Sequence, residues 1–121
     1  MAIAKLGTVV LDCPDPLALA DFYAGLVGGT PKAEEDGSWV TLSGHGGTDL
    51  AFQLAPGHVP PQWPSANASQ QFHLDLTVED LDAAEEHILA LGAQRLEPGE
   101  PGRAWRVYAD PAGHPVCLCA C

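Results

Sequence analysis

Basic residues are scarce in this chain. Five Lys and Arg residues stand against 16 Asp and Glu residues among 121 positions, so the formal net charge is −11 with the histidines neutral. Nucleic acids and anionic lipids are bound through Lys and Arg side chains that neutralise phosphate groups. We therefore expect neither a nucleic acid nor a membrane surface as a partner. The acidic balance instead suits a cationic or neutral ligand, although it also serves solubility.

Long apolar runs are missing as well. No run approaches the roughly 20 apolar residues that a membrane span needs, and the first residues lead directly into a strand-like segment rather than into the apolar core of a signal peptide. The apolar share of 46% and the charged share of 17% are typical of a globular chain, and the length suits one domain. We expect a single cytoplasmic domain.

Cysteines are few, and their spacing is unusual. Cys117, Cys119 and Cys121 alternate along one predicted strand, and Cys13 lies far upstream. Residues i and i+2 of a strand point to the same side and seldom meet disulfide geometry. Chelating cysteines are more often spaced C-x-x-C. We therefore expect free, buried thiols rather than a disulfide framework or a cysteine metal site.

The first half of the chain predicts a strand, a helix and three further strands. Asp15 can accept backbone hydrogen bonds as a helix cap, and Pro16 suits the first helical position because its missing N–H needs no partner there. Gly28 and Gly29 end the helical pattern. The predicted elements are a strand over 5–12, a helix over 16–27 and strands over 30–35, 38–44 and 48–55.

The second half repeats this order after a segment rich in proline. Residues 57–70 lack periodicity and predict a linker or a lid. The predicted elements beyond it are a strand over 72–78, a helix over 79–92 and strands over 93–97, 103–110 and 114–121.

The two halves indicate an internal duplication. A shift of 65 residues brings Thr8 onto His73 and Asp15 onto Asp80, and the order of elements is the same in both halves. We predict an α+β fold in which two tandem βαβββ modules form a curved mixed sheet around a cleft, within one chain or across a dimer. Module 1 is expected over about 5–56 and module 2 over about 71–121, within one domain of 1–121.

Two local motifs, taken with the repeat, resemble a known family. They are the Asp-Leu-Asp-Ala-Ala helix start over 80–84 and the Asp-Pro-Ala-Gly-His turn over 110–114. The chain as a whole is similar to the vicinal oxygen chelate superfamily, which includes glyoxalase I, extradiol dioxygenases, fosfomycin resistance enzymes and bleomycin resistance proteins. It most resembles the small glyoxalase-like members. The resemblance implies their fold more firmly than any one activity.

The resemblance also implies where a metal would lie. Metal-dependent members hold the ion with four ligands from the first and last strands of the two modules. The matching positions here are Thr8, Gln53, His73 and Cys117, with Ala51 as the alternative to Gln53. His73 alone is a strong ligand as it stands, so we expect no metal cofactor. The alternative is one divalent ion such as Zn, Ni, Mn or Fe on that set.

Ligand contacts are expected from aromatic residues and from one His and Asp pair. Asp75 should face the same side as His73, where it could orient the imidazole or receive a cationic group. Aromatic side chains around a cleft suit a flat, partly apolar ligand, although for any single one of them a place in the core is favoured. The candidate ligand-binding residues are Trp39, Phe52, Trp63, His73, Asp75 and Trp105.

The function implied by the resemblance is sequestration without catalysis. We expect a homodimer that binds a small organic ligand, such as an antibiotic or another aromatic natural product, without a metal and without catalytic residues. The alternative is a metal-dependent glyoxalase-like lyase, isomerase or dioxygenase that acts on vicinal oxygens. A binding or regulatory module for a metabolite is a third interpretation.

Overall fold

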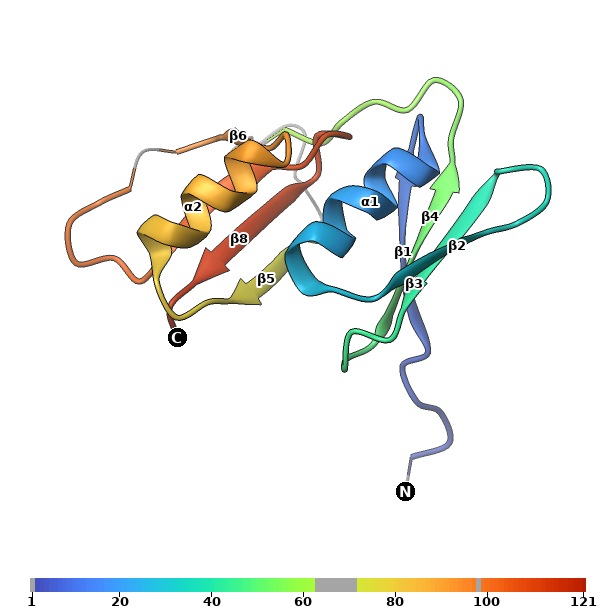
Figure 1. Cartoon of the computed structure of the whole chain (residues 1–121), viewed down its shortest axis with the longest axis horizontal. Coiled ribbons are helices and arrows are strands. Elements are labelled where there is room, and N and C mark those ends of the chain that lie inside the picture. Colours follow the sequence, from blue (N-terminus) through green and yellow to red (C-terminus); the bar gives the residue numbers. More distant parts are fainter. Residues whose placement is uncertain (1, 63–71, 98) are drawn as a thin grey trace. The chain divides into compact units, whose positions relative to one another are not determined.

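The chain forms two compact units, each with one helix and four strands (Figure 1). The computed structural model describes residues 2–62, 72–97 and 99–121. The units cover Met1–His58 and Val59–Cys121. We call them the first and the second module.

The first module is a four-stranded mixed sheet with one helix on it. The strand order is β1-β4-β3-β2, in which β1 and β4 are parallel and the other neighbours antiparallel. Its elements are β1 (Thr8–Cys13), α1 (Pro16–Val27), β2 (Thr30–Ala33), β3 (Trp39–Ser43) and β4 (Asp49–Leu54).

Helix α1 begins and packs as its sequence predicts. The Asp15 carboxylate accepts a hydrogen bond of 3.1 Å from the backbone N–H of Ala18, and Pro16 opens the helix. Tyr23 of α1 stacks on Phe52 of β4, with ring centroids 5.6 Å apart, and both side chains are fully buried. The core of this module therefore lies between α1 and one face of its sheet.

The second module repeats this topology. Its strand order is β5-β8-β7-β6, in which β5 and β8 are parallel and the other neighbours antiparallel. Its elements are β5 (Leu74–Thr77), α2 (Leu81–Ala90), β6 (Gln94–Arg95), β7 (Trp105–Ala109) and β8 (Pro115–Cys119). The identical strand order confirms the duplication predicted from the sequence.

Helix α2 is attached to its sheet by polar contacts around one carboxylate. Glu85 accepts hydrogen bonds from the Tyr108 hydroxyl at 2.9 Å and from Arg95 at 2.8 and 3.1 Å, and it pairs with Arg106 at 3.4 Å. Ile88 is the one α2 residue that is fully buried. These contacts show that Arg95, Arg106 and Tyr108 point from the sheet towards α2.

The cysteines depart from the sequence expectation. Cys119 and Cys121 form a disulfide, so the expectation of four free thiols was wrong for this pair. The expectation assumed that the strand continues, but β8 ends at Cys119 and the chain bends beyond it, which brings the two Cα atoms to 5.3 Å. Cys13 and Cys117 are free and buried, as predicted.

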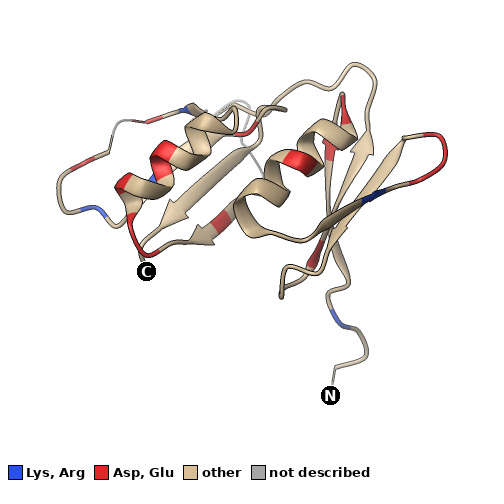
Figure 2. Ribbon diagram, viewed as in Figure 1, with Lys and Arg blue, Asp and Glu red and all other residues tan. Residues whose placement is uncertain are grey.

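Acidic residues occur on both modules, whereas basic residues are sparse (Figure 2). Among the described residues, neither α1 nor α2 has the length and apolar character needed to cross a membrane.

Candidate functional site

Each module has one sheet face that its own helix does not cover. In the second module Arg106 and Tyr108 point towards α2, so strand alternation places Trp105 and Val107 on the opposite face. Cys117 pairs with both Val107 and Asp75 and therefore lies on that face as well. We call this surface the helix-free face of the second module.

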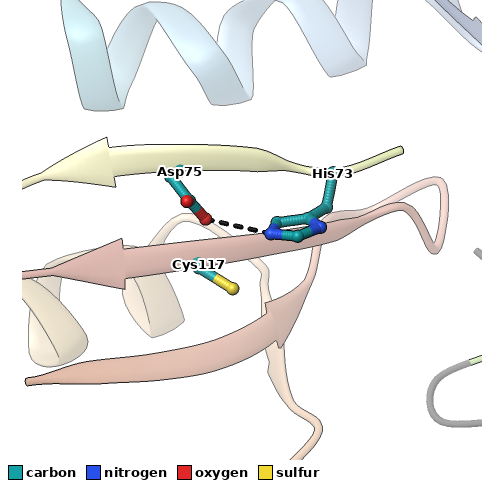
Figure 3. Close-up of side chains that lie close together, drawn as sticks. All are labelled: His73, Asp75 and Cys117. Atoms are coloured by element: carbon teal, nitrogen blue, oxygen red, sulfur yellow. Dashed lines mark ion pairs between the residues drawn. The ribbon is translucent and has the colours of Figure 1, made fainter. Parts of the chain in front are cut away.

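Three side chains with metal-ligating or acid–base atoms meet on this face (Figure 3). His73 precedes β5, and its Nε2 lies 3.0 Å from Oδ1 of Asp75. One donor atom from each of His73, Asp75 and Cys117 lies within 4.8 Å of the others. The contact confirms the sequence prediction that Asp75 faces His73.

The Cys117 thiol is held in its neutral form. Its residue is 4% exposed, and burial, followed by the negative charge of Asp75, raises the pKa of the thiol to about 11. A protonated thiol is a weak nucleophile at neutral pH. A thiol that stays protonated supports binding better than covalent catalysis.

An exposed indole lies on the same face. Trp105 is 47% exposed, which is high for so large an apolar side chain. The Arg103 guanidinium lies 5.1 Å from the centroid of its ring and donates from Nε to the Trp105 carbonyl oxygen at 3.0 Å. Trp105 is therefore held in place while part of its ring remains accessible.

Arg103 and Glu97 are parts of this site that the sequence did not predict. Arg103 Nη1 pairs with Glu97 Oε2 at 3.3 Å, and its Nη2 is buried without a hydrogen-bond partner among the described residues. Both residues lie in the segment between β6 and β7. Their spacing follows neither helix nor strand periodicity, so no pattern in the sequence signalled the pair.

The aromatic candidates of the first module lie on opposite faces of its sheet. Phe52 is fully buried against α1, so it belongs to the core and not to the candidate site. Trp39 lies on the helix-free face of that sheet, half-buried, with its Nε1 donating to Thr41 Oγ1 at 3.1 Å. Trp63 lies outside the described residues.

The first-module positions offered for a metal are not neighbours. Thr8 pairs with Asp49, whereas Gln53 pairs with Asp12, four steps further along the same two strands. At about 3.3 Å per residue this separates them by roughly 13 Å. The register also shows which residue of β4 corresponds to Cys117. Ala51 pairs with Val10 as Cys117 pairs with Asp75, so the equivalent position is Ala51 rather than Gln53.

The residues of the second module determine which metal ion could be held there. His73, Asp75 and Cys117 offer nitrogen, oxygen and sulfur donors close together, a set that fits zinc. Hard ions such as Mg²⁺ prefer oxygen ligands throughout, so a buried sulfur fits them poorly. The donor set fits a metal of the zinc type, with Asp75 in a place where no ligand was expected.

Comparison with known proteins agrees with the fold. The family model described as a glyoxalase-like domain matches residues 8–119, and the chain belongs to that family. Its fold is that of the glyoxalase/bleomycin resistance/dioxygenase proteins, as the sequence predicted. No curated protein matches the chain in sequence.

Solved structures with the same fold include resistance and binding proteins. The fosfomycin resistance protein FosX from Mesorhizobium loti has a TM-score of 0.72 at 16% identity, with 99% of this chain and 94% of that chain covered. A glyoxalase/bleomycin resistance protein/dioxygenase family enzyme from Burkholderia phytofirmans PsJN has a TM-score of 0.71 at 18% identity, covering 95% and 97%. TnmS3, an antibiotic binding protein from Streptomyces sp. CB03234, has a TM-score of 0.59 at 22% identity, covering 98% and 97%.

Proposed function

We propose that this chain is a small-molecule binding protein that captures an aromatic natural product, such as an antibiotic, on the helix-free face of its second module. The observation that carries this proposal is the exposed Trp105 on the same sheet face as the His73 and Asp75 pair. An accessible indole contributes apolar area and stacking, while a few polar groups orient the ligand.

Capture of this kind requires neither turnover nor a metal ion. Tight non-covalent binding lowers the free concentration of the compound by mass action. The protonated Cys117 thiol on the face is consistent with a binding surface rather than with an activated nucleophile. The similarity in fold to an antibiotic binding protein and to a fosfomycin resistance protein supports the same proposal.

The charge of the face sets the class of ligand. Asp75 has a side chain that is 67% exposed and is adjacent to His73, so its carboxylate can receive a cationic or hydrogen-bonding group. With a net charge of −11, the protein attracts cations and repels anions over a longer range. We propose a cationic or neutral ligand, a homodimer as the assembly and the cytoplasm as the compartment.

The second candidate is a metal-dependent glyoxalase-like lyase, isomerase or dioxygenase. It is favoured by the three donors His73, Asp75 and Cys117 within 4.8 Å of one another. A bound ion would supply Lewis acidity to vicinal oxygens of a substrate. The two functions differ in outcome, because capture leaves the ligand chemically unchanged.

The experiment that tests capture uses two variants of one module. A panel of aromatic natural products is titrated by calorimetry against the wild type, Trp105→Ala and Leu89→Ala, with fosfomycin as a compound without aromatic rings. Leu89 is 37% exposed on α2 and gives a control for loss of exposed apolar area away from the face.

We expect Trp105→Ala to weaken binding of the best ligand by at least about 1 kcal/mol, roughly fivefold in Kd, as the loss of an aromatic contact does. Leu89→Ala should leave the Kd unchanged. Equal affinity of the wild type and Trp105→Ala would reject the helix-free face as the binding surface.

A further inference from the structure

The disulfide between Cys119 and Cys121 lies at the end of β8, on the strand that pairs with the exposed indole of β7. We propose that this pair is a reversible thiol–disulfide exchange site, at which a low-molecular-weight thiol of the glutathione class reduces the bridge and the matching disulfide restores it. The site does not depend on the proposed capture, because it rests on the positions and exposure of the two cysteines rather than on a bound compound.

The strand register places Cys119 next to Trp105. The two residues are direct partners in the antiparallel pair of β7 and β8. The Ala120 N–H donates to the Ala104 carbonyl oxygen at 2.8 Å, which makes these two residues a hydrogen-bonded pair. The adjacent pair, Trp105 and Cys119, is therefore of the non-hydrogen-bonded kind, whose side chains approach most closely. Because Cys119 follows Cys117 by two residues on β8, its side chain points to the helix-free face, beside the indole.

The bridge is more accessible than the two free thiols. Cys121 is exposed and Cys119 is half-buried. The free cysteines, Cys13 and Cys117, are both buried. An attacking thiolate must reach a sulfur atom of the bridge, so the rate of exchange depends on this access. Burial, followed by the charge of Asp75, raises the pKa of the Cys117 thiol to about 11, so Cys117 stays protonated at neutral pH and does not attack the bridge.

The exchange proceeds in two balanced steps. A thiolate, RS⁻, attacks the Cys121 sulfur and forms a mixed disulfide with it, and Cys119 leaves as a thiolate that takes a proton from water. A second thiolate attacks the bound RS sulfur, so that RSSR leaves and Cys121 is released and protonated. Overall two RSH molecules pass two electrons and two protons to the bridge, and two cysteine thiols result. The reverse sequence, with RSSR as the oxidant, restores the bridge.

The fold gives this bridge little protection from reduction. By linkage, folding stabilises a disulfide by the same free energy that the disulfide contributes to folding. The bridge closes a loop with one intervening residue, Ala120, so this contribution is small. Structural disulfides resist reduction by the glutathione pool, whereas exposed ones are labile. Disulfides in a reducing compartment, such as the cytoplasm proposed for this chain, are usually transient, catalytic or redox-sensing.

The test places the full chain, purified without reductant, in a series of glutathione redox buffers. Free thiols are alkylated on the native protein and located by peptide mass spectrometry, while circular dichroism monitors the fold. We expect Cys119 and Cys121 to become alkylated as the proportion of reduced glutathione rises, and to be protected again when oxidised glutathione is added. Cys13 and Cys117 should react only after denaturation, because both are buried.

Variants of single cysteines isolate the mixed disulfide. Cys119→Ser leaves Cys121 without its partner, so oxidised glutathione should add one glutathionyl group per chain at Cys121. The double variant Cys119→Ser with Cys121→Ser should gain none. Cys13→Ser removes a buried thiol of the first module and should match the wild type in the alkylation assay.

Tryptophan fluorescence reports where the exchange takes place. A disulfide quenches an adjacent indole, so we expect the emission of the wild type to rise on reduction. Trp105→Phe should abolish this rise, since Trp105 is the strand partner of Cys119. A rise that persists in Trp105→Phe would contradict the position of the bridge beside this indole.

Three results would overturn the exchange site. The first is a bridge that stays oxidised in the largest excess of reduced glutathione. The second is a native protein in which Cys119 and Cys121 are alkylated even in oxidised buffer, and the third is a loss of the fold that accompanies reduction. The failure of capture is a separate result, because none of these measurements contains a natural product.

Discussion

Ala51 of the first module occupies the register position that Cys117 occupies in the second. Ala51 pairs with Val10 and Cys117 pairs with Asp75, in two parallel strand pairs related by the internal repeat. The same pair of positions therefore holds two apolar residues in the first module and an acid and a thiol in the second. Within the described part of the chain, the cluster of metal-ligating side chains therefore belongs to the second module.

Alkaline pH should destabilise the protein through Cys117. The native fold raises the pKa of this thiol from 9.0 to about 11, so the unfolded chain releases the proton first. The stabilisation is fully present below pH 9 and is lost as pH rises towards 11. Tyr108, whose pKa is raised to about 12, mainly by burial, adds to the loss at higher pH.

Urea unfolding at several values between pH 8 and pH 11 measures this effect. We expect the free energy of unfolding of Cys117→Ser to fall less steeply over this range than that of the wild type. Parallel curves for the two proteins would show that the thiol does not carry the pH dependence. The variant Tyr108→Phe measures how much of the pH dependence of stability comes from the phenol.

Glu85 should be the principal polar attachment of α2. Glu85→Gln removes the charge that accepts from Tyr108 and Arg95 and pairs with Arg106. We expect a loss of about 2 kcal/mol in the free energy of unfolding, since hydrogen bonds to a partly buried charge contribute about 1.5–3 kcal/mol. Glu86→Gln changes an exposed neighbour on the same helix and should shift stability by less than about 0.5 kcal/mol. If chemical denaturation gave the same loss in the free energy of unfolding for Glu85→Gln and Glu86→Gln, Glu85 would not be the principal attachment of α2.

Substitution of two adjacent glycines should distinguish the cost of backbone strain from the cost of a steric clash. Gly28 and Gly29 both have positive φ, at 83° and 92°. A Cβ on Gly29 would lie 2.5 Å from the Ser43 carbonyl oxygen, whereas one on Gly28 meets nothing within 4 Å. Gly28→Ala should cost about 1–3 kcal/mol, because its φ of 83° and ψ of −165° lie in a region that is essentially restricted to glycine. Gly29→Ala should cost clearly more by thermal unfolding, and similar losses in the two variants would contradict the close approach.

Reduction of the Cys119–Cys121 disulfide should have little effect on the fold. The bridge joins residues only two positions apart, and so short a loop restricts the unfolded chain weakly. We expect dithiothreitol to lower the free energy of unfolding by no more than about 2 kcal/mol. The double variant Cys119→Ser with Cys121→Ser should not respond to the reductant. Complete unfolding of the wild type on reduction would show that the bridge is structural.

The repeat and most of the elements were predictable because they depend on local patterns. Capping residues such as Asp15 and Asp80 mark the helix starts, and apolar periodicity marks the helices and strands between turns. The proximity of Asp75 to His73 followed from strand alternation alone. Each of these inferences needs only residues that are neighbours in the chain.

The rest of the site depends on pairings between distant strands. Sequence periodicity does not fix which face of β4 meets the helix, so the sequence predicts a ligand contact for Phe52, although this residue packs on Tyr23. The register of β1 with β4 separates Thr8 from Gln53 and places Ala51 opposite Val10. Arg103 reaches Trp105 through a loop, where no periodic pattern applies.

In the function proposed for this chain, the second module captures a small molecule without changing it. Native mass spectrometry of the protein loaded with the tightest-binding compound of the panel, before and after chelator, tests this most directly. We expect a stoichiometric complex in both conditions, from which the compound is released with its mass unchanged. Conversion of the compound to a product, or its complete loss on chelation, would contradict capture and favour a metal-dependent enzyme.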